Sequence, residues 1–157
     1  MAIATDITPT PTVTDAPATS GNRSVRTIGI ISVVVGLVLG LAGIFTYNLV
    51  GSQLAAQNIV VAGDAPRFAG EPVTGPFTAY AEAQIIDAHA KKSTNGLTYA
   101  EMDREDPARA TAMNASFLQA SLYTSVIAFG VAALVSGLGI MFLMIGAGFI
   151  GLAKVRR

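Results

Sequence analysis

The sequence of 157 residues contains no cysteine, no tryptophan and one histidine, His89. The absence of cysteine excludes a disulfide framework, a thiolate metal site, a lipoprotein anchor and covalent haem attachment. One histidine cannot supply a two-histidine, one-carboxylate iron site, a three-histidine zinc site or two axial haem ligands. We therefore expect no catalytic residues, no metal and no cofactor in this chain, and we do not expect an enzyme.

Charged residues are absent from two long stretches, 27–50 and 122–153, which are almost entirely apolar. A bilayer core is about 30 Å thick, so a spanning helix needs about 20 apolar residues. These stretches predict an all-α membrane protein built on a hairpin of two transmembrane helices. Because proton relays and ion pathways use ionisable groups inside the membrane, we do not expect transport by this chain alone.

A cleaved signal peptide is the alternative interpretation of the first apolar stretch. Its length exceeds the roughly 7–15 apolar residues of a signal sequence, and 22 residues rich in Thr, Pro and Ala come before it. Residues 1–22 are therefore predicted to be a disordered cytoplasmic tail, because they carry too little apolar surface to offset the entropy of ordering.

Basic residues flank the hairpin at its two free ends and predict its orientation. Arg23 and Arg26 precede the first span, and the basic end 154–157 follows the second. The segment between the spans carries eight acidic residues and five basic ones, none of them next to a span. The positive-inside rule therefore predicts a plasma-membrane protein with both termini in the cytoplasm. The formal charges cancel over the whole chain, and we expect no nucleic-acid partner.

Residues 51–106 are predicted to form an extracytoplasmic insert that is partly helical. Thr78 is a suitable N-cap for a helix over about 79–91, and the capping-box spacing of Thr98 and Glu101 predicts a short helix over 99–105. Asp106 and Pro107 are typical of an N-cap and a first helical position. They predict one long helix over 107–153 that spans the membrane from about residue 122. The few large hydrophobic residues of the insert either pack against this helix or dock on another protein.

Small residues recur along both spans, where they allow another helix backbone to come close. They fit packing of the two spans on each other, packing on a partner protein, or both on different helix faces. The predicted packing residues are Gly29, Gly36, Gly40, Gly43, Gly130, Ala133 and Gly137.

A cluster of acidic residues lies just before the long helix, at Glu101, Asp103, Glu105 and Asp106. The spacing lacks the ligand pattern of an EF-hand loop. A solvated helix terminus explains such a cluster, and a docking patch for a basic partner is the alternative.

Three segments carry a resemblance to a known family: 62–70 (AGDAPRFAG) with 75–80 (GPFTAY), then 98–107 (TYAEMDREDP), then 115–122 (ASFLQASL). They resemble small actinobacterial two-span membrane proteins, which are often labelled aromatic ring-opening dioxygenases. At least one such protein resembles an accessory subunit of the respiratory supercomplex that joins a cytochrome bcc complex to a haem–copper cytochrome oxidase. The dioxygenase label conflicts with the single histidine, because ring opening by non-haem iron needs several protein ligands.

The resemblance implies a non-catalytic accessory subunit that contacts the cytochrome bcc complex, the cytochrome oxidase or both, within the lipid bilayer. It would support assembly or stability of the electron-transport supercomplex without carrying electrons. The alternative is a free-standing or homodimeric membrane protein, built on Gly36 and Gly40, with an envelope or sensing role.

Overall fold

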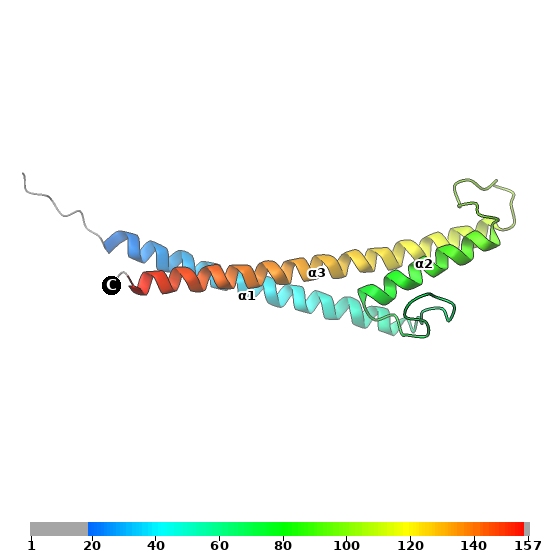
Figure 1. Cartoon of the computed structure of the whole chain (residues 1–157). Helices are drawn as coiled ribbons and strands as arrows, with labels where there is room; N and C mark the ends of the chain where they lie inside the picture. The colour runs from blue at the N-terminus through cyan, green and yellow to red at the C-terminus, as the bar shows by residue number, and fades with distance from the viewer. Residues whose placement is uncertain (1–18, 156–157) are drawn as a thin grey trace, which may run out of the picture.

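The structure, a computed structural model, describes residues 19–155, with side chains from Arg23 onward. Its described residues form three helices, α1 (Thr19–Ala56), α2 (Pro76–Ser93) and α3 (Arg109–Val155). Helices α1 and α3 run antiparallel as a long rod, and α2 lies along the N-terminal half of α3 (Figure 1). The all-α class predicted from the sequence is confirmed.

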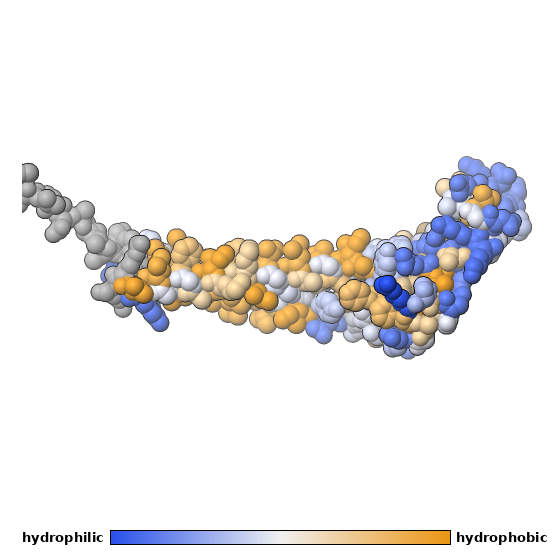
Figure 2. Space-filling view, viewed as in Figure 1, coloured by the Kyte–Doolittle hydropathy of each residue, from blue (hydrophilic) through white to orange (hydrophobic). Residues whose placement is uncertain are grey.

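Both long helices are long and apolar enough to cross a membrane. An 18-residue stretch within Arg23–Ala56 of α1 has a mean hydropathy of 2.7, and one within α3 has a mean hydropathy of 2.4. Large side chains such as Leu41, Phe45 and Ile127 are about two-thirds exposed along the rod. Figure 2 shows the resulting apolar band, which gives way to hydrophilic surface where α2 and the loops lie.

The long helix predicted from residue 107 is confirmed with small shifts at its ends. Its 47 residues extend about 70 Å without interruption. The Asp106 carboxylate accepts a hydrogen bond of 2.8 Å from the Ala108 N–H just before the helix, as expected of an N-cap. Lys154 belongs to α3, so the predicted basic end is helical at its start. Arg156 and Arg157 lie outside the described residues.

Two other predicted helix starts are wrong. Helix α1 begins at Thr19, so residues 19–22 belong to a helix rather than to the predicted tail, whose residues 1–18 lie outside the described part of the chain. Helix α2 begins at Pro76 after the N-cap Gly75, because proline has the φ value that a first helical turn requires. Thr78 takes the third helical position, where its hydroxyl accepts a hydrogen bond from the Gly75 N–H.

The predicted short helix over 99–105 is absent, and this segment consists of turns. One of the two expected capping contacts forms, since the Glu101 carboxylate accepts a hydrogen bond from the Thr98 N–H. The Thr98 hydroxyl donates to the same carboxylate, and the Glu101 N–H donates to the Thr98 carbonyl instead of the hydroxyl. The chain then turns again, with the Asp106 N–H donating to the Asp103 carbonyl, and buries Met102 to 5% exposure. The contacts between Thr98 and Glu101 therefore stabilise a single turn, and no helix continues from it.

Helices α1 and α3 pack through small residues that recur every seven positions on both helices. A Cβ atom on Gly36 would lie 2.7 Å from the Gly139 carbonyl oxygen, and one on Gly29 would lie 3.0 Å from the Gly146 carbonyl oxygen. A Cβ atom on Gly43 would likewise lie 2.7 Å from the Ala132 carbonyl oxygen. The pairs advance by seven residues in opposite directions, which is the register of an antiparallel supercoiled pair. The two backbones are close enough that no side chain fits between them.

We predict that Gly139→Ala weakens the packing of α1 on α3. The added methyl group would lie 2.5 Å from the Gly40 backbone nitrogen, so the helices must separate. Overpacking of this kind costs about 1–3 kcal/mol of the free energy of unfolding. Denaturation in mixed detergent micelles measures this change.

Gly137→Ala is the matched control, because a Cβ atom at Gly137 meets no atom within 4 Å. Alanine has the higher helix propensity, by up to about 1 kcal/mol, so this variant should be neutral or more stable. Equal destabilisation by both substitutions would contradict the packing described.

Candidate functional site

The segment between α1 and α2, residues 57–75, folds back on itself and closes the end of the rod. The Val61 N–H donates to the Glu71 carbonyl and the Val73 N–H donates to the Ile59 carbonyl, each at 2.9 Å. Val61 and Val73 are almost fully buried. The Glu82 carboxylate of α2 accepts a hydrogen bond of 2.9 Å from the Ala62 N–H. This segment is therefore fixed to α2.

His89 lies on the exposed surface of α2, as its sequence context predicts, and it has a partner there. Its Nε2 atom lies 2.8 Å from a carboxylate oxygen of Asp64, in the segment between α1 and α2. This contact lowers the pKa of the Asp64 carboxyl below its ordinary value. The partner lies 25 positions away in the sequence, so spacing within the helix could not reveal it.

The four residues of the predicted acidic docking patch lie in the turns before α3 and not on a helix. Two of the carboxylates hold the loop in shape, because that of Glu101 accepts hydrogen bonds from Thr98 and that of Asp106 caps the approach to α3. Asp103 and Glu105 form no ion pair with the described residues. Glu101, Asp103 and Glu105 are exposed, and a docking role for this cluster stays a prediction.

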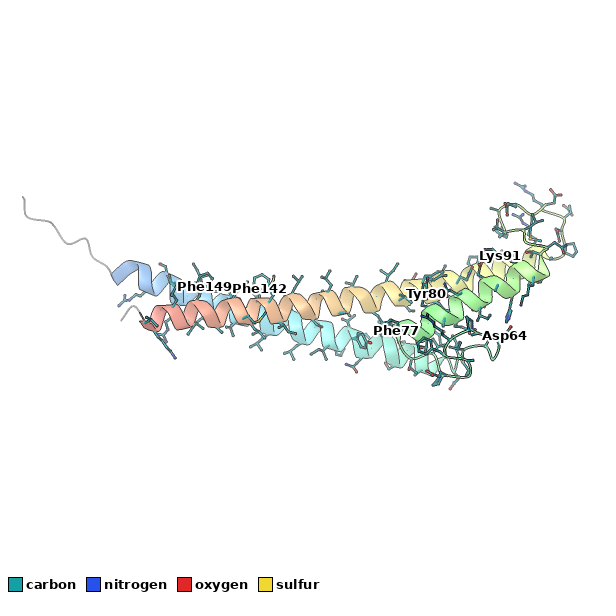
Figure 3. The ribbon with its side chains drawn as sticks, viewed as in Figure 1. Asp64, Phe77, Tyr80, Lys91, Phe142 and Phe149 are labelled. Carbon is teal, nitrogen blue, oxygen red and sulfur yellow. The ribbon has the colours of Figure 1, made fainter. Side chains whose placement is uncertain are left out.

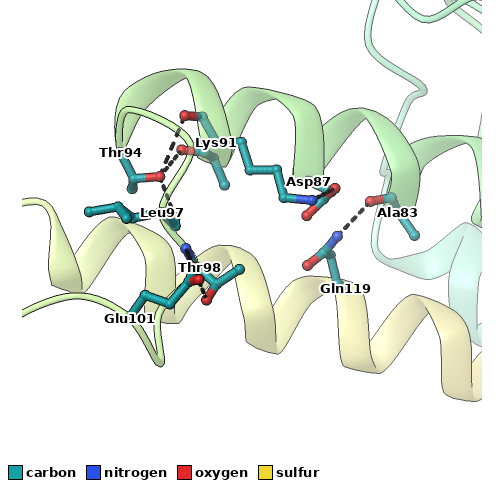
Figure 4. Close-up of polar contacts among 9 residues, drawn as sticks. Ala83, Asp87, Lys91, Thr94, Leu97, Thr98, Glu101 and Gln119 are labelled. Atoms are coloured by element: carbon teal, nitrogen blue, oxygen red, sulfur yellow. Dashed lines mark hydrogen bonds and ion pairs between the residues drawn. The ribbon is translucent and has the colours of Figure 1, made fainter.

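The same loop, residues 94–108, is anchored from both sides by polar contacts. Thr94 is buried, and its hydroxyl contacts the carbonyls of Ala90 and Leu97 at the end of α2 (Figure 4). On the other side, the Arg109 guanidinium donates to the Met102 carbonyl and stacks 4.2 Å from the Tyr99 ring centroid. These contacts hold the tip of the molecule as an ordered turn.

Helix α2 packs on α3 through alanines, and the large hydrophobic residues of the insert divide between core and surface. Ala79 and Ala83 are fully buried, and the Gln119 side chain donates a hydrogen bond of 3.1 Å to the Ala83 carbonyl (Figure 4). Of the large hydrophobic residues, Ile85 and Met102 are buried, whereas Phe77 and Phe117 are 74% and 65% exposed. Some of the large hydrophobic residues are therefore buried within the chain, and others are exposed where another protein could contact them.

The predicted small-residue packing positions also divide into two groups. Gly29, Gly36 and Gly43 face α3, and the backbone of Gly40 lies against Gly139. The positions predicted on the second span, Gly130, Ala133 and Gly137, do not face α1. The small α3 residues on the side of α1 are Ala132, Gly139, Gly146 and Ala153, and their seven-residue spacing is shared by Gly130 and Gly137.

Helix α3 therefore has two faces of small residues, and only one of them is covered by α1. Cβ atoms on Gly130, Gly137, Gly148 and Gly151 would meet no atom within 4 Å. A glycine on an open helix face gives a second helix direct access to the backbone. This open face of α3 is the candidate interaction surface.

Among residues 19–155, no three side chains of histidine, cysteine, aspartate or glutamate gather into a group that could hold a metal ion. The polar contacts described above are structural: they cap helices and fix loops. Comparison of the chain with protein-family models, with curated proteins and with solved structures gives no match.

We predict that the carboxyl group of Glu101 titrates below the ordinary glutamate pKa. The two hydrogen bonds from Thr98 favour the charged form and lower the pKa of this group. Its contribution to loop stability is therefore fully present above the pKa of the unfolded chain. It is lost as the pH falls through the lowered pKa of the folded state.

A pH titration followed by NMR checks this prediction. Thr98→Val removes the hydroxyl donor and should raise the pKa of Glu101 toward its ordinary value. The same exchange at Thr111, which forms no hydrogen bond with Glu101, should leave it unchanged. No difference between the Thr98 variant and the parent chain would contradict this role for Thr98.

Proposed function

We propose that this chain is a two-span membrane protein with both termini in the cytoplasm. Support comes from the exposed apolar surface of α1 and α3, which is far larger than the apolar patches that soluble monomers leave in water. The basic residues at the free ends of the hairpin favour this orientation by the positive-inside rule. In this arrangement α2 and the loops 57–75 and 94–108 form an extracytoplasmic head.

Within the membrane, we propose a non-catalytic accessory subunit that is held by a larger complex. The observation that carries this proposal is the second small-residue face of α3, at Gly130, Ala133 and Gly137, which no part of the described chain covers. Lipid provides no hydrophobic driving force between helices, so helices associate in it through close van der Waals packing. Faces of small residues allow such packing.

The larger complex that we propose is the actinobacterial respiratory supercomplex of cytochrome bcc and cytochrome oxidase. This choice rests on the resemblance of segments 62–70, 75–80, 98–107 and 115–122 to small actinobacterial two-span membrane proteins, at least one of which resembles an accessory subunit of this supercomplex. The uncharged spans agree with a subunit that carries neither electrons nor protons. The role would be to support assembly or stability by contact alone.

The alternative, a homodimer built on Gly36 and Gly40, receives less support. A Cβ atom on Gly36 would lie 2.7 Å from the Gly139 carbonyl of the same chain, so α3 already occupies this position, whereas a Cβ atom on Gly40 would meet no atom within 4 Å. A second copy could use Gly36 only by displacing α3. We therefore prefer a partner on the open face of α3.

Because the chain has no native cysteine, single introduced cysteines report its topology. We predict that Ala100→Cys, in the head, reacts with a membrane-impermeant maleimide on intact cells. Val155→Cys, at the end of α3, should react only after the membrane is permeabilised. Labelling of Val155→Cys on intact cells would contradict the proposed orientation.

Affinity purification after gentle detergent extraction tests the partner. We predict that the unmodified chain recovers cytochromes, visible in the absorption spectrum. The double variant Gly130→Leu with Gly137→Leu should lose about tenfold or more of that recovery, equivalent to about 1.4 kcal/mol of binding free energy. Bulky side chains on this face would prevent close approach of a partner helix.

The matched control is Val131→Leu with Leu138→Ile, one position further along the same helix and exposed on other faces. It should recover cytochromes as the unmodified chain does. Recovery of the unmodified chain alone, with no cytochrome absorption, would contradict the proposed function.

A further inference from the structure

The start of α2 is held at the level where both apolar stretches end. The Thr74 carbonyl oxygen lies 3.1 Å from the position of a Cβ atom on Gly51, one residue beyond the first stretch. The Tyr80 ring lies 5.9 Å from the ring of Tyr123, the second residue of the other stretch. The first turns of α2 therefore sit at the edge of the apolar band (Figure 3).

One face of α2 at this edge is aromatic and open. Phe77, Tyr80 and Gln84 follow the three- and four-residue spacing of one helix face, opposite to the buried Ala79 and Ala83. Phe77 is 74% exposed and Tyr80 is 47% exposed. Aromatic side chains in such positions are typical of the boundary between lipid and water.

The segment before α2 adds a cation and a third aromatic ring to this face. Phe68 has a left-handed backbone with φ of 58°, a conformation that a bulky residue adopts at a cost in energy. The turn is closed by a hydrogen bond of 2.9 Å from the Glu71 N–H to the Phe68 carbonyl. The Phe68 side chain is 38% exposed, and its neighbour Arg67 is exposed without an ion pair or hydrogen bond to the described residues.

These two elements enclose a hollow of about 170 Å³. Its walls are apolar and aromatic, and Arg67 and Gln84 supply its polar groups. The lining residues come from the segment before α2 (Pro66, Arg67 and Phe68) and from α2 (Phe77, Tyr80, Ala81 and Gln84). A cation beside an aromatic-walled hollow at this depth is complementary to a phosphate group above the start of an acyl chain.

We propose that Arg67, Phe68, Phe77 and Tyr80 form a phospholipid contact site in the outer leaflet. The guanidinium of Arg67 binds the lipid phosphate, and the aromatic side chains insert at the level of the glycerol and upper acyl chain. The site fixes the height and tilt of the head against the bilayer. It rests on the proposed membrane orientation and is independent of which complex holds the spans.

The absence of native tryptophan makes Phe77→Trp a single fluorescent reporter in the full-length chain. In liposomes, its emission should shift to shorter wavelength. Lipids brominated near the headgroup end of the acyl chain should quench most of it, and lipids brominated near the chain terminus should quench less. Phe117→Trp is the matched control, because Phe117 is similarly exposed but lies on the order of 10 Å further from the apolar band along α3. Its emission should stay at long wavelength and unquenched.

Arg67→Glu in the Phe77→Trp chain should shift the emission back to longer wavelength and remove most of the quenching. Arg104→Glu, in the loop at the tip of the head, should change neither. Carbonate extraction and circular dichroism of each variant establish that it is inserted and helical.

Two outcomes would overturn the proposed lipid site. One is an inserted, folded Phe77→Trp chain whose fluorescence lipid does not quench, a result that would leave the proposed function standing. The other is an indole that is shielded from lipid only when cytochromes co-purify, which would assign this surface to a protein partner.

Discussion

The close approach of the α1 and α3 backbones is the contact on which the rest of the molecule depends. Glycine at three positions of α1 meets glycine or alanine on α3 in a register of seven residues, so the helices touch without intervening side chains. In lipid, where burial of apolar surface brings helices no advantage, such contact must come from dense packing. It leaves almost all the large side chains of the pair pointing outward.

This packing explains how a chain with so little core can present several distinct surfaces. Helix α3 contacts both other helices. Helix α1 covers one of its faces, α2 packs along its N-terminal half, and a second face of small residues stays open. At the head, buried alanines and a few valines hold α2 and its preceding segment, while Phe77 and Phe117 remain exposed. The polar contacts fix loops and helix ends, and the open surfaces are those that a neighbour could use.

Much of this fold could be predicted from the sequence because its signals are local. Long uncharged stretches predicted the two long helices, and the Asp106-Pro107 pair placed the start of α3 within two residues. What the sequence could not reveal depends on contacts between distant residues, such as Glu82 with Ala62 and His89 with Asp64. The predicted short helix over 99–105 does not form, because burial of Met102 and the stacking of Arg109 on Tyr99 favour turns over a helix. Spacing alone could not decide which face of α3 packs on α1, because Gly130 and Gly137 lie seven residues apart just as Gly139 and Gly146 do.

We propose that another membrane protein holds the open face of α3, and photo-crosslinking in native membranes is the most direct test. A benzophenone amino acid replaces Leu134, which is 62% exposed beside Ala133 on the open side of α3. We expect a light-dependent adduct with a cytochrome bcc or cytochrome oxidase subunit, identified by mass spectrometry. Adducts with lipid alone, or with a second copy of this chain, would contradict it.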